Sequence, residues 1–256
     1  MEVKISAIIL TLNEDKNIKR CISSVVGIAD DIVVVDSFST DKTEEICISM
    51  GVRFVKHKFE GYIEQKNWAL TQSMYPVVLS LDADEALSDE LRNSILEVKH
   101  CWDADGYSFN RLTSYCGKWI HHCGWYPDKK LRLWEVKKGV WGGTNPHDMV
   151  IMEPGVHIKT LNGDLMHYTF YTISEHIIQV NRFSEIKAKA KLAKGRKTNM
   201  GAILVNPLFK FVKSYFIRGG FRDGRHGFYV CSISAFSTFL TYAKLFELQR
   251  EARNGK

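Results

Sequence analysis

Short apolar runs alternate with amphipathic segments along the first hundred residues of the chain. The runs are rich in β-branched and aliphatic residues and lie at positions 5–10, 32–35, 52–55 and 77–81. Unbroken apolar runs of this length are typical of strands that are covered on both faces, as in a parallel sheet. Helical segments between them would complete strand–helix–strand units, which are right-handed when the strands are parallel. The pattern therefore predicts an α/β nucleotide-binding sheet flanked by helices.

Helical spacing is clearest between the first two runs. There, one apolar face at i, i+3, i+4 and i+7 is made by Ile18, Cys21, Ile22 and Val25. After the second run, Ser39 or Asp41 is placed to cap a helix that continues through Ile46 and Met50. Gly51 suits the left-handed position that commonly ends such a helix.

The second half of the chain has a different pattern. Residues 100–170 show no clear period and are crowded with tryptophans, glycines and histidines. Thr172 and Glu175 then have the spacing of a capping box, which predicts the start of a helix. The residues expected on its inward face are Ile173, Ile177, Val180 and Ala190. We expect one nucleotide-binding domain over residues 1–170 and a helical extension, basic and aromatic, over residues 171–256.

Composition is ordinary for a globular protein, but charge is distributed unevenly. Of the 256 residues, 45% are apolar and 25% are charged, and the net charge is +6. Residues 182–225 hold twelve Lys or Arg against two acids, so the remainder of the chain is net acidic. No zinc-finger spacing, RNP-like motif or helix-turn-helix pattern supports a nucleic-acid partner. An anionic membrane surface explains the basic block better.

The N-terminus and the cysteines favour a cytoplasmic protein. The first apolar stretch, residues 6–10, is too short for a signal peptide and is followed at once by polar residues. The six cysteines form no CxxC pair and have no regular spacing. We therefore expect reduced thiols.

Two carboxylates directly follow the fourth apolar run. Alternate side chains of an extended segment point the same way, so Asp82 and Asp84 are expected to project together from the carboxyl end of the strand. Open α/β sheets bind ligands at that edge, and two carboxylates suit a hard divalent cation that grips a diphosphate. The alternative is a solvated turn before the helix that starts near Ser88, since an Asp-x-Asp motif alone is common.

A further acid, Asp36, ends the second apolar run. A carboxylate at this edge can accept hydrogen bonds from a base N–H or a ribose hydroxyl. Helix capping explains Ser39, Thr40 and Asp41 without a ligand, but it explains Asp36 less well because this residue comes earlier in the sequence.

Four motifs resemble family 2 glycosyltransferases in order and spacing, over residues 4–150. They are Thr11-Leu12-Asn13-Glu14, Val35-Asp36-Ser37-Phe38-Ser39-Thr40-Asp41-Lys42-Thr43, Gln65-Lys66-Asn67 and Leu81-Asp82-Ala83-Asp84-Glu85. The details are most similar to the branch that contains bacterial lipopolysaccharide-core β-glucosyltransferases. That narrower resemblance is carried by Trp125-Tyr126-Pro127-Asp128, Leu131-Arg132-Leu133 and Gly219-Gly220-Phe221-Arg222-Asp223-Gly224. The resemblance implies a GT-A fold, with a mostly parallel Rossmann-like sheet, and an inverting mechanism.

The resemblance also implies roles at the nucleotide. Asp36 would contact the uracil or a related base, and Thr11, Asn13 and Glu14 would frame the nucleotide. Asp82 would hold the ribose or a metal-bound water.

The same resemblance implies Mg²⁺ or Mn²⁺ as the cofactor. Asp84 would ligate the cation that bridges the diphosphate and compensates charge on the leaving group. His167 is a further candidate for contact with the metal or the diphosphate, although a single histidine is more often structural. Lys66 and Arg132 are candidates for neutralising phosphate charge, with surface exposure as the alternative.

Inversion requires a base that deprotonates the acceptor hydroxyl. In the family branch it is usually a Glu or Asp after a His, and Asn145-Pro146-His147-Asp148 fits with Asp148 as the base. An ordinary Asp, with a pKa near ~3.9, is a weak base and needs an environment that raises it. A turn residue after Pro146 is the alternative.

The C-terminal extension carries the membrane hypothesis. Residues 228–243 lack any formal charge, but a spanning helix needs about 20 apolar residues, so this segment is expected to be buried or interfacial. Residues 208–218 mix aromatic and basic side chains, which suits the plane of an anionic leaflet. Packing of a helical subdomain on the sheet is the alternative.

Together these features predict a metal-dependent inverting glycosyltransferase. Its donor would be a nucleoside-diphosphate sugar, with UDP-hexose favoured, and its acceptor a lipopolysaccharide core or another lipid-linked saccharide at the cytoplasmic face of the inner membrane. A nucleotidyltransferase is the alternative enzyme, but it would normally show a Gly-rich phosphate loop after the first strand. A non-catalytic sugar-binding or nucleotide-binding protein that kept the fold is the third hypothesis.

Overall fold

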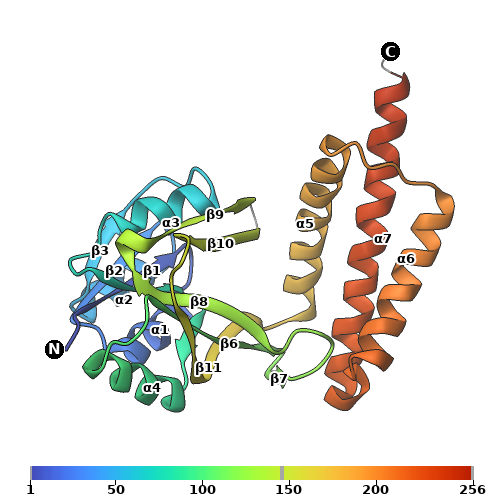
Figure 1. Cartoon of the computed structure of the whole chain (residues 1–256). Coiled ribbons are helices and arrows are strands. Elements are labelled where there is room, and N and C mark those ends of the chain that lie inside the picture. The colour runs from blue at the N-terminus through green and yellow to red at the C-terminus, as the bar shows by residue number, and fades with distance from the viewer. Residues whose placement is uncertain (1, 145–146, 255–256) are drawn as a thin grey trace. The chain divides into compact units, whose positions relative to one another are not determined.

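The computed structural model describes residues 2–144 and 147–254 (Figure 1). The chain divides into two compact units. The first consists of Met1–Leu112 and Asp128–Tyr168, and the second of Thr113–Pro127 and Thr169–Lys256.

A sheet that is parallel over its first four strands and antiparallel beyond them organises the first unit. Its strands, in spatial order, are β3 (Arg53–Lys56), β2 (Asp31–Asp36), β1 (Ile5–Thr11), β4 (Val77–Asp82), β8 (Asp128–Glu135), β6 (Gly106–Tyr115), β11 (Ile158–Phe170) and β5 (Glu85–Leu87). The first four are parallel, β8 is antiparallel to β4 and β6, and β5 is antiparallel to β11. The predicted α/β class is confirmed. Because the chain crosses from β3 to β4 past β1, the carboxyl ends of β1 and β4 meet at a switch point of the kind that binds ligands.

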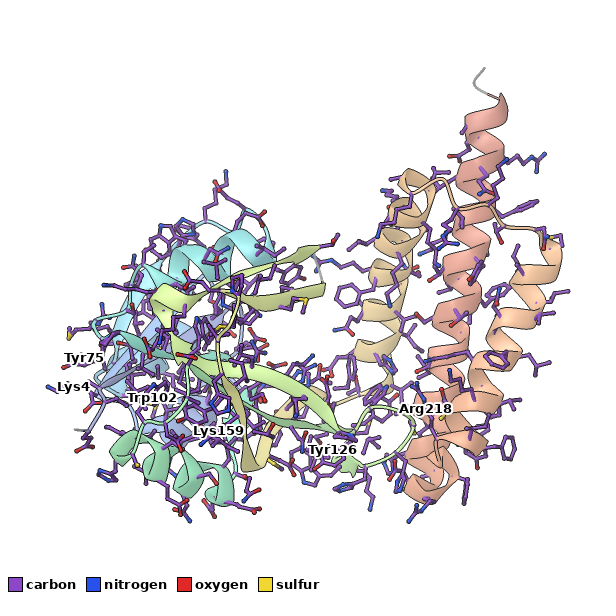
Figure 2. The ribbon with its side chains drawn as sticks, viewed as in Figure 1. Lys4, Tyr75, Trp102, Tyr126, Lys159 and Arg218 are labelled. Atoms are coloured by element: carbon purple, nitrogen blue, oxygen red, sulfur yellow. The ribbon has the colours of Figure 1, made fainter. Side chains whose placement is uncertain are left out.

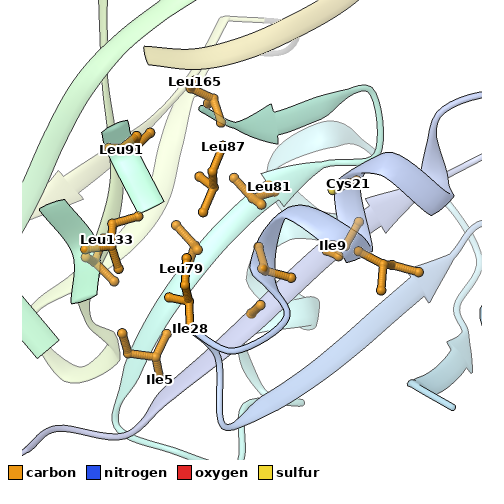
Figure 3. Close-up of a cluster of buried hydrophobic side chains, with 14 of the residues drawn as sticks. Ile5, Ile9, Cys21, Ile28, Leu79, Leu81, Leu87, Leu91, Leu133 and Leu165 are labelled. Carbon is orange, nitrogen blue, oxygen red and sulfur yellow. The ribbon is translucent and has the colours of Figure 1, made fainter. Parts of the chain in front are cut away.

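The four apolar runs coincide with β1 to β4. The helices of this unit are α1 (Ile18–Val25), α2 (Thr43–Ser49), α3 (Tyr62–Leu70) and α4 (Asp89–His100). The predicted face of α1 is fully buried, in a core that also holds Ile5, Leu79 and Leu133 (Figure 3). Gly51 has the expected left-handed φ, at 69°.

The N-cap of α2 lies one residue after Asp41 and three after Ser39, the two predicted caps. Lys42 occupies the N-cap position and makes no side-chain cap. Asp41 nevertheless accepts hydrogen bonds from the backbone N and the hydroxyl of Thr43, at 3.0 and 2.6 Å. It therefore satisfies one of the free N–H groups at the helix start.

A separate two-stranded ribbon also belongs to the first unit. A short 3₁₀ turn (Val136–Lys138) leads into β9 (Gly139–Thr144), which pairs antiparallel with β10 (His147–Met152). Asp148 lies opposite Gly143 in this pairing.

The second unit is largely helical. It contains the hairpin of β7 (Lys118–Ile120) on Thr113–Tyr115, and the helices α5 (Ile173–Ala193), α6 (Met200–Val212), η2 (Lys213–Ile217), η3 (Gly220–Asp223) and α7 (Gly224–Asn254). The long helix α7 packs against both α5 and α6. The core of the second unit is formed by Tyr115, Ile120, Cys123, Phe170, Val230 and Cys231.

The start of α5 was predicted correctly, but its inward face was predicted only in part: Val180 is buried as expected, whereas Ala190 is exposed. Thr172 and Glu175 form the capping box. The buried residues are His176, Val180, Ser184 and Ala188, whereas Ile173 and Ile177 are 40% and 44% exposed. Small and polar side chains face α7 here, and hydrophobicity alone could not identify that face.

Candidate active site

Two loops at the carboxyl edge of the parallel strands are fastened to each other. Asn13, after β1, has a left-handed φ of 56°, and its backbone N donates to Ser39 Oγ at 2.8 Å. Its side-chain oxygen accepts a hydrogen bond from the backbone N of Thr40 at 2.8 Å. The backbone N of Glu14 donates to Thr43 Oγ1 at 2.9 Å. The motifs after β1 and β2 therefore form one structure at the ligand-binding edge.

Thr11 and Asp36, at the ends of β1 and β2, use their polar atoms differently. Thr11 is buried, and its hydroxyl has no hydrogen-bond partner within the described part of the chain. Since buried hydroxyls normally have partners, this atom is a candidate for ligand contact. Asp36 is fully buried and accepts hydrogen bonds from the backbone N and hydroxyl of Ser39. Its carboxylate shapes its own loop, and its contact with a base stays a prediction.

Glu14 lies near other acids. Its Oε2 accepts a hydrogen bond from Asn17 Nδ2 at 2.7 Å. Burial raises the pKa of Glu14 to about 7, and the charges of Asp84, Asp41 and Asp82 act in the same direction. The carboxyl group is therefore close to half-protonated at neutral pH, and an added cation would favour its ionised form.

Charged side chains of alternating sign form a connected chain of ion pairs. Lys66 Nζ, on α3, lies 2.7 Å from Asp148 Oδ2 on β10 and 3.3 Å from Asp82 Oδ1 at the end of β4. Arg132 Nη2, on β8, lies 3.1 Å from Asp82 Oδ2 and 2.9 Å from Glu85 Oε1 on β5. The structure thus connects Asp148, the candidate base, to Asp82 of the Asp-x-Asp motif through Lys66.

The chain of ion pairs continues through Arg111 on β6. This guanidinium lies 3.3 Å from Glu85 Oε1 and 2.8 Å from Asp128 Oδ2. Neither Arg111 nor Glu85 was singled out from the sequence. Glu85 is adjacent to the Asp-x-Asp motif, which was the available signal, whereas Arg111 lies in the region without periodicity and gave none.

The ion pairs fix the charge states of the central residues. Burial alone would raise the pKa of Asp82, but the charges of Lys66 and Arg132 outweigh it and hold the pKa well below its usual range. Burial alone would lower the pKa of Arg132, but the negative charges of Glu85 and Asp82 outweigh burial and hold this pKa above its ordinary value. The side chains of Lys66 and Arg132 are only 7% and 4% exposed, so the surface alternative for both residues is wrong.

Three consecutive residues of α3 hold three different elements. Gln65 Nε2 donates to Ser37 Oγ, after β2, at 3.1 Å. Lys66 makes the ion pairs described above. Asn67 Nδ2 donates to the backbone O of Trp141 at 2.8 Å, and its Oδ1 accepts from the backbone N of Trp141 at 2.9 Å. This segment therefore fixes the position of β9 and, through Lys66, that of Asp148.

Asp148 is the one residue of its sequence motif whose side chain is described. Asn145 and Pro146 lie outside the described residues, and so does the side chain of His147. The Asp148 side chain is 14% exposed, so it is accessible to a small ligand while it contacts Lys66.

Asp84 and His167 form a second cluster at the same edge. The antiparallel pairing of β5 with β11 places His167 opposite Glu85, and His167 Nε2 lies 3.2 Å from Asp84 Oδ2. Two adjacent ligands of an octahedral cation, each about 2.1 Å from it, lie about 3 Å apart. This pair therefore fits a shared cation. No group of three or more His, Cys, Asp or Glu side chains that could hold a metal is present among the described residues, so other ligands would come from substrate and water.

Comparisons with known proteins agree with the sequence motifs. A family model described as Glycosyl transferase family 2 matches residues 6–122. An uncharacterised glycosyltransferase of Rickettsia typhi is 33% identical, over 98% of this chain and 89% of its own length. The lipopolysaccharide core biosynthesis glycosyltransferase LpsC of Rhizobium meliloti is 30% identical, over 96% of this chain and 93% of its own length.

Solved structures give weaker likenesses. TarS (residues 1–349) of S. aureus has a TM-score of 0.44 and 12% identity, over 99% of this chain and 92% of that chain. Glucosyl-3-phosphoglycerate synthase of Mycobacterium tuberculosis, solved with Mn²⁺, uridine diphosphate and phosphoglyceric acid, has a TM-score of 0.36 and 23% identity, over 43% of each chain. Both TM-scores are low, and the assignment to a family rests on the sequence relatives.

Proposed function

The chain belongs to glycosyl transferase family 2, and we propose that it is a metal-dependent inverting enzyme that transfers hexose from UDP-hexose to a saccharide. The observation that supports this proposal most strongly is the connection of Asp148, through Lys66, to the Asp-x-Asp motif. A candidate base and the candidate diphosphate site are thereby held in one network at the carboxyl edge of the sheet.

Asp84 and His167 are the proposed metal ligands. Their 3.2 Å separation suits a shared cation. Bound Mg²⁺ or Mn²⁺ would supply positive charge against the negative charge that develops on the departing nucleoside diphosphate. Asp82, the third ligand predicted from the sequence, is already neutralised by Lys66 and Arg132. We therefore favour its other predicted role, contact with the ribose or a metal-bound water.

The remaining residues bind and orient the donor. Thr11 offers an unpaired buried hydroxyl, and Asn13, Glu14 and Asp36 frame the nucleoside within the fastened loops. Lys66 and Arg132 supply positive charge beside the diphosphate, and Arg132 keeps two nitrogens, Nε and Nη1, without a partner in the described region.

Asp148 is the proposed base. An ionised carboxylate is the form that accepts a proton, and the Lys66 ammonium at 2.7 Å is a counter-ion for that form. As the acceptor hydroxyl attacks the anomeric carbon, its proton passes to Asp148 while the bond to the nucleoside diphosphate breaks on the opposite face of the sugar.

The proposed acceptor is a lipid-linked saccharide of a bacterial cell envelope, with lipopolysaccharide core favoured. LpsC of Rhizobium meliloti, a relative over nearly its full length, is described as acting in lipopolysaccharide core biosynthesis. Such an acceptor would place the enzyme in the cytoplasm, at the cytoplasmic face of the inner membrane.

Calorimetry with and without Mn²⁺ tests the donor site. We expect UDP and UDP-hexoses to bind the native protein more tightly with Mn²⁺, and Asp84→Ala to abolish this metal dependence while leaving the thermal unfolding midpoint nearly unchanged. The same change at the exposed Glu60, written Glu60→Ala, is the control. Equal UDP affinity with and without Mn²⁺ in the native protein contradicts the metal site. Binding of nucleoside triphosphates but no nucleotide sugar would favour a nucleotidyltransferase.

A further inference from the structure

The outer face of α6 and η2 is unusually apolar. The exposed side chains along this continuous helical segment are Met200, Leu204, Val205, Leu208, Phe209, Val212, Phe216 and Ile217. Leu204 and Leu208 are each 66% exposed, and Ile217 is 73% exposed. These positions recur every three or four residues, so they form one stripe.

The inner face of the same segment is more polar than its outer face. Ile203 and Ser214 are buried, and Asn206 and Lys210 are half-buried. An amphipathic helix in water places its apolar stripe on the core. This segment packs Phe211 and Tyr215 on the core and leaves a second apolar stripe exposed. Apolar patches of this kind mark a surface that contacts another apolar phase.

Cations lie within the same helical segment and directly after it. Lys210 and Lys213 lie within the segment, and Arg218 follows it directly (Figure 2); Arg222 is exposed in η3. None of these four forms an ion pair with a carboxylate of the described residues. Asp223, the adjacent acid, is instead occupied by hydrogen bonds from the backbone N of His122 at 2.8 Å and from its ring.

We propose that the outer face of α6 and η2 docks in the plane of an anionic lipid leaflet. Apolar side chains would enter the boundary between headgroups and acyl chains, and Lys213, Arg218 and Arg222 would contact phosphates. The inference goes beyond the proposed function, because it concerns a surface of the second unit and needs none of the donor-site roles.

An in-plane position suits the segment better than a membrane crossing. Met200–Ile217 is long and apolar enough to cross by length and composition, yet it contains Lys210 and Lys213 and packs on α7. Lys213 is compatible with the interface, where a long cationic side chain reaches the headgroups, and Lys210 lies on the inner face.

The cations also favour a lipid surface over a second copy of the chain. A two-fold interface uses the same patch twice, so it would bring two sets of unpaired cations together. An anionic surface neutralises the same cations, and each contributes measurably to membrane binding.

Vesicle flotation tests the proposal with the full chain. We expect binding to vesicles of phosphatidylcholine with phosphatidylglycerol, weak binding to phosphatidylcholine alone, and a fall with added salt, because surface charge is screened beyond about 8 Å at physiological ionic strength. The pair Leu204→Ser and Leu208→Ser should reduce binding at least about tenfold. A matched pair in the first unit, Ile48→Ser and Met74→Ser, removes side chains of similar exposure, 64% and 60%, and should bind normally.

A second pair tests the charge. Lys213→Ser with Arg222→Ser should lower binding to anionic vesicles roughly 25-fold at low salt, about fivefold for each cation. Lys58→Ser with Lys137→Ser removes the same charge from exposed positions of the first unit and should have little effect.

Three outcomes would overturn the proposal. The first is absence of flotation in every condition. The second is an equal loss of vesicle binding in the Leu204→Ser, Leu208→Ser variant and in its Ile48→Ser, Met74→Ser control. The third is a dimer in the absence of lipid that Leu204→Ser with Leu208→Ser converts to monomer. UDP affinity with Mn²⁺ is measured in parallel for every variant. Loss of vesicle binding with normal UDP affinity separates this proposal from the proposed function.

Discussion

At the scale of single residues, alternating charges determine how the site is held together. Contacts of 2.7 to 3.3 Å join five side chains one to the next, in the order Asp148, Lys66, Asp82, Arg132 and Glu85. Removing one member of a buried ion pair leaves its partner uncompensated and costs about 3–5 kcal/mol. Variants that preserve shape and hydrogen bonding therefore give clearer tests of chemistry than truncations.

Asp148→Asn is such a variant. The amide oxygen still contacts Lys66, but the side chain no longer accepts the proton of the acceptor hydroxyl. We expect UDP affinity close to that of the native protein and a transfer rate reduced at least ~10²-fold. Calorimetry measures the first quantity and release of UDP in the presence of acceptor the second. Turnover near the native rate would move the base elsewhere, and Glu153→Gln would be the next variant to measure.

Glu14 predicts a dependence of stability on pH. Its pKa is about 7 in the folded protein against an ordinary value of 4.5, so between these values the folded state holds a proton that the unfolded state has released. The free energy of unfolding therefore falls as pH rises through this window, and the loss is complete above pH 7. Glu14→Gln keeps the shape and removes the charge.

We expect Glu14→Gln to unfold a few degrees higher than the native protein at pH 8 and at a similar temperature at pH 4, in scans with a chelator that removes divalent cations. Glu60→Gln, at an exposed position, should change the midpoint equally at both pH values. A midpoint of Glu14→Gln below the native value at pH 8 would show that the carboxylate stabilises the fold.

At the scale of elements, the local hydrophobic pattern was sufficient to predict a strand or helix where burial is regular along it. Strands β1, β2 and β4 are buried along almost their whole length and are mostly apolar, and α1 shows one regular apolar face. Strand β3, at the edge of the sheet, is partly exposed. The middle of the chain lacks such regularity. In β8, Arg132 is a buried charge whose partner Glu85 comes 47 residues earlier, and no local pattern shows that this charge is satisfied.

Helices of the second unit illustrate the same limit. The inward face of α5 carries His176 and Ser184, and the outward face of α6 carries Leu204 and Leu208. Each contradicts the rule that apolar stripes face the core, for a different reason. Small residues on α5 accommodate α7, whereas the α6 face is explained by a lipid surface under the present proposal.

The candidate site was partly predictable for the same reasons. Asp82, Asp84 and Asp36 follow recognisable strands, so topology alone places them at one edge. The pairing of His167 with Asp84 depends on the long-range register of β5 with β11. Sequence proposed both residues, but it could not supply the 3.2 Å contact.

At the scale of the whole molecule, the chain passes between its two compact units more than once. Thr113–Pro127 belongs to the same unit as α5, α6 and α7, although its sequence lies within the segment expected to form the first domain. Its β7 hairpin contacts α7. A boundary placed at residue 170 therefore separates residues that pack together.

A chain that ends at residue 170 is expected not to fold as an independent domain. It would retain Tyr115, Ile120 and Cys123 but lose Val230 and Cys231, which cover them. Full burial of a large apolar side chain contributes about 1.5–3 kcal/mol, so exposing several approaches the whole stability of a typical domain, about 5–15 kcal/mol. We expect the fragment to be largely insoluble, or to bind a hydrophobic dye and unfold without a sharp transition. A chain ended at Arg250, which keeps this cluster intact, should stay soluble and unfold in a sharp transition in the same measurements. Cooperative unfolding of the 1–170 fragment, at a midpoint near that of the full chain, would instead establish residues 1–170 as an autonomous domain.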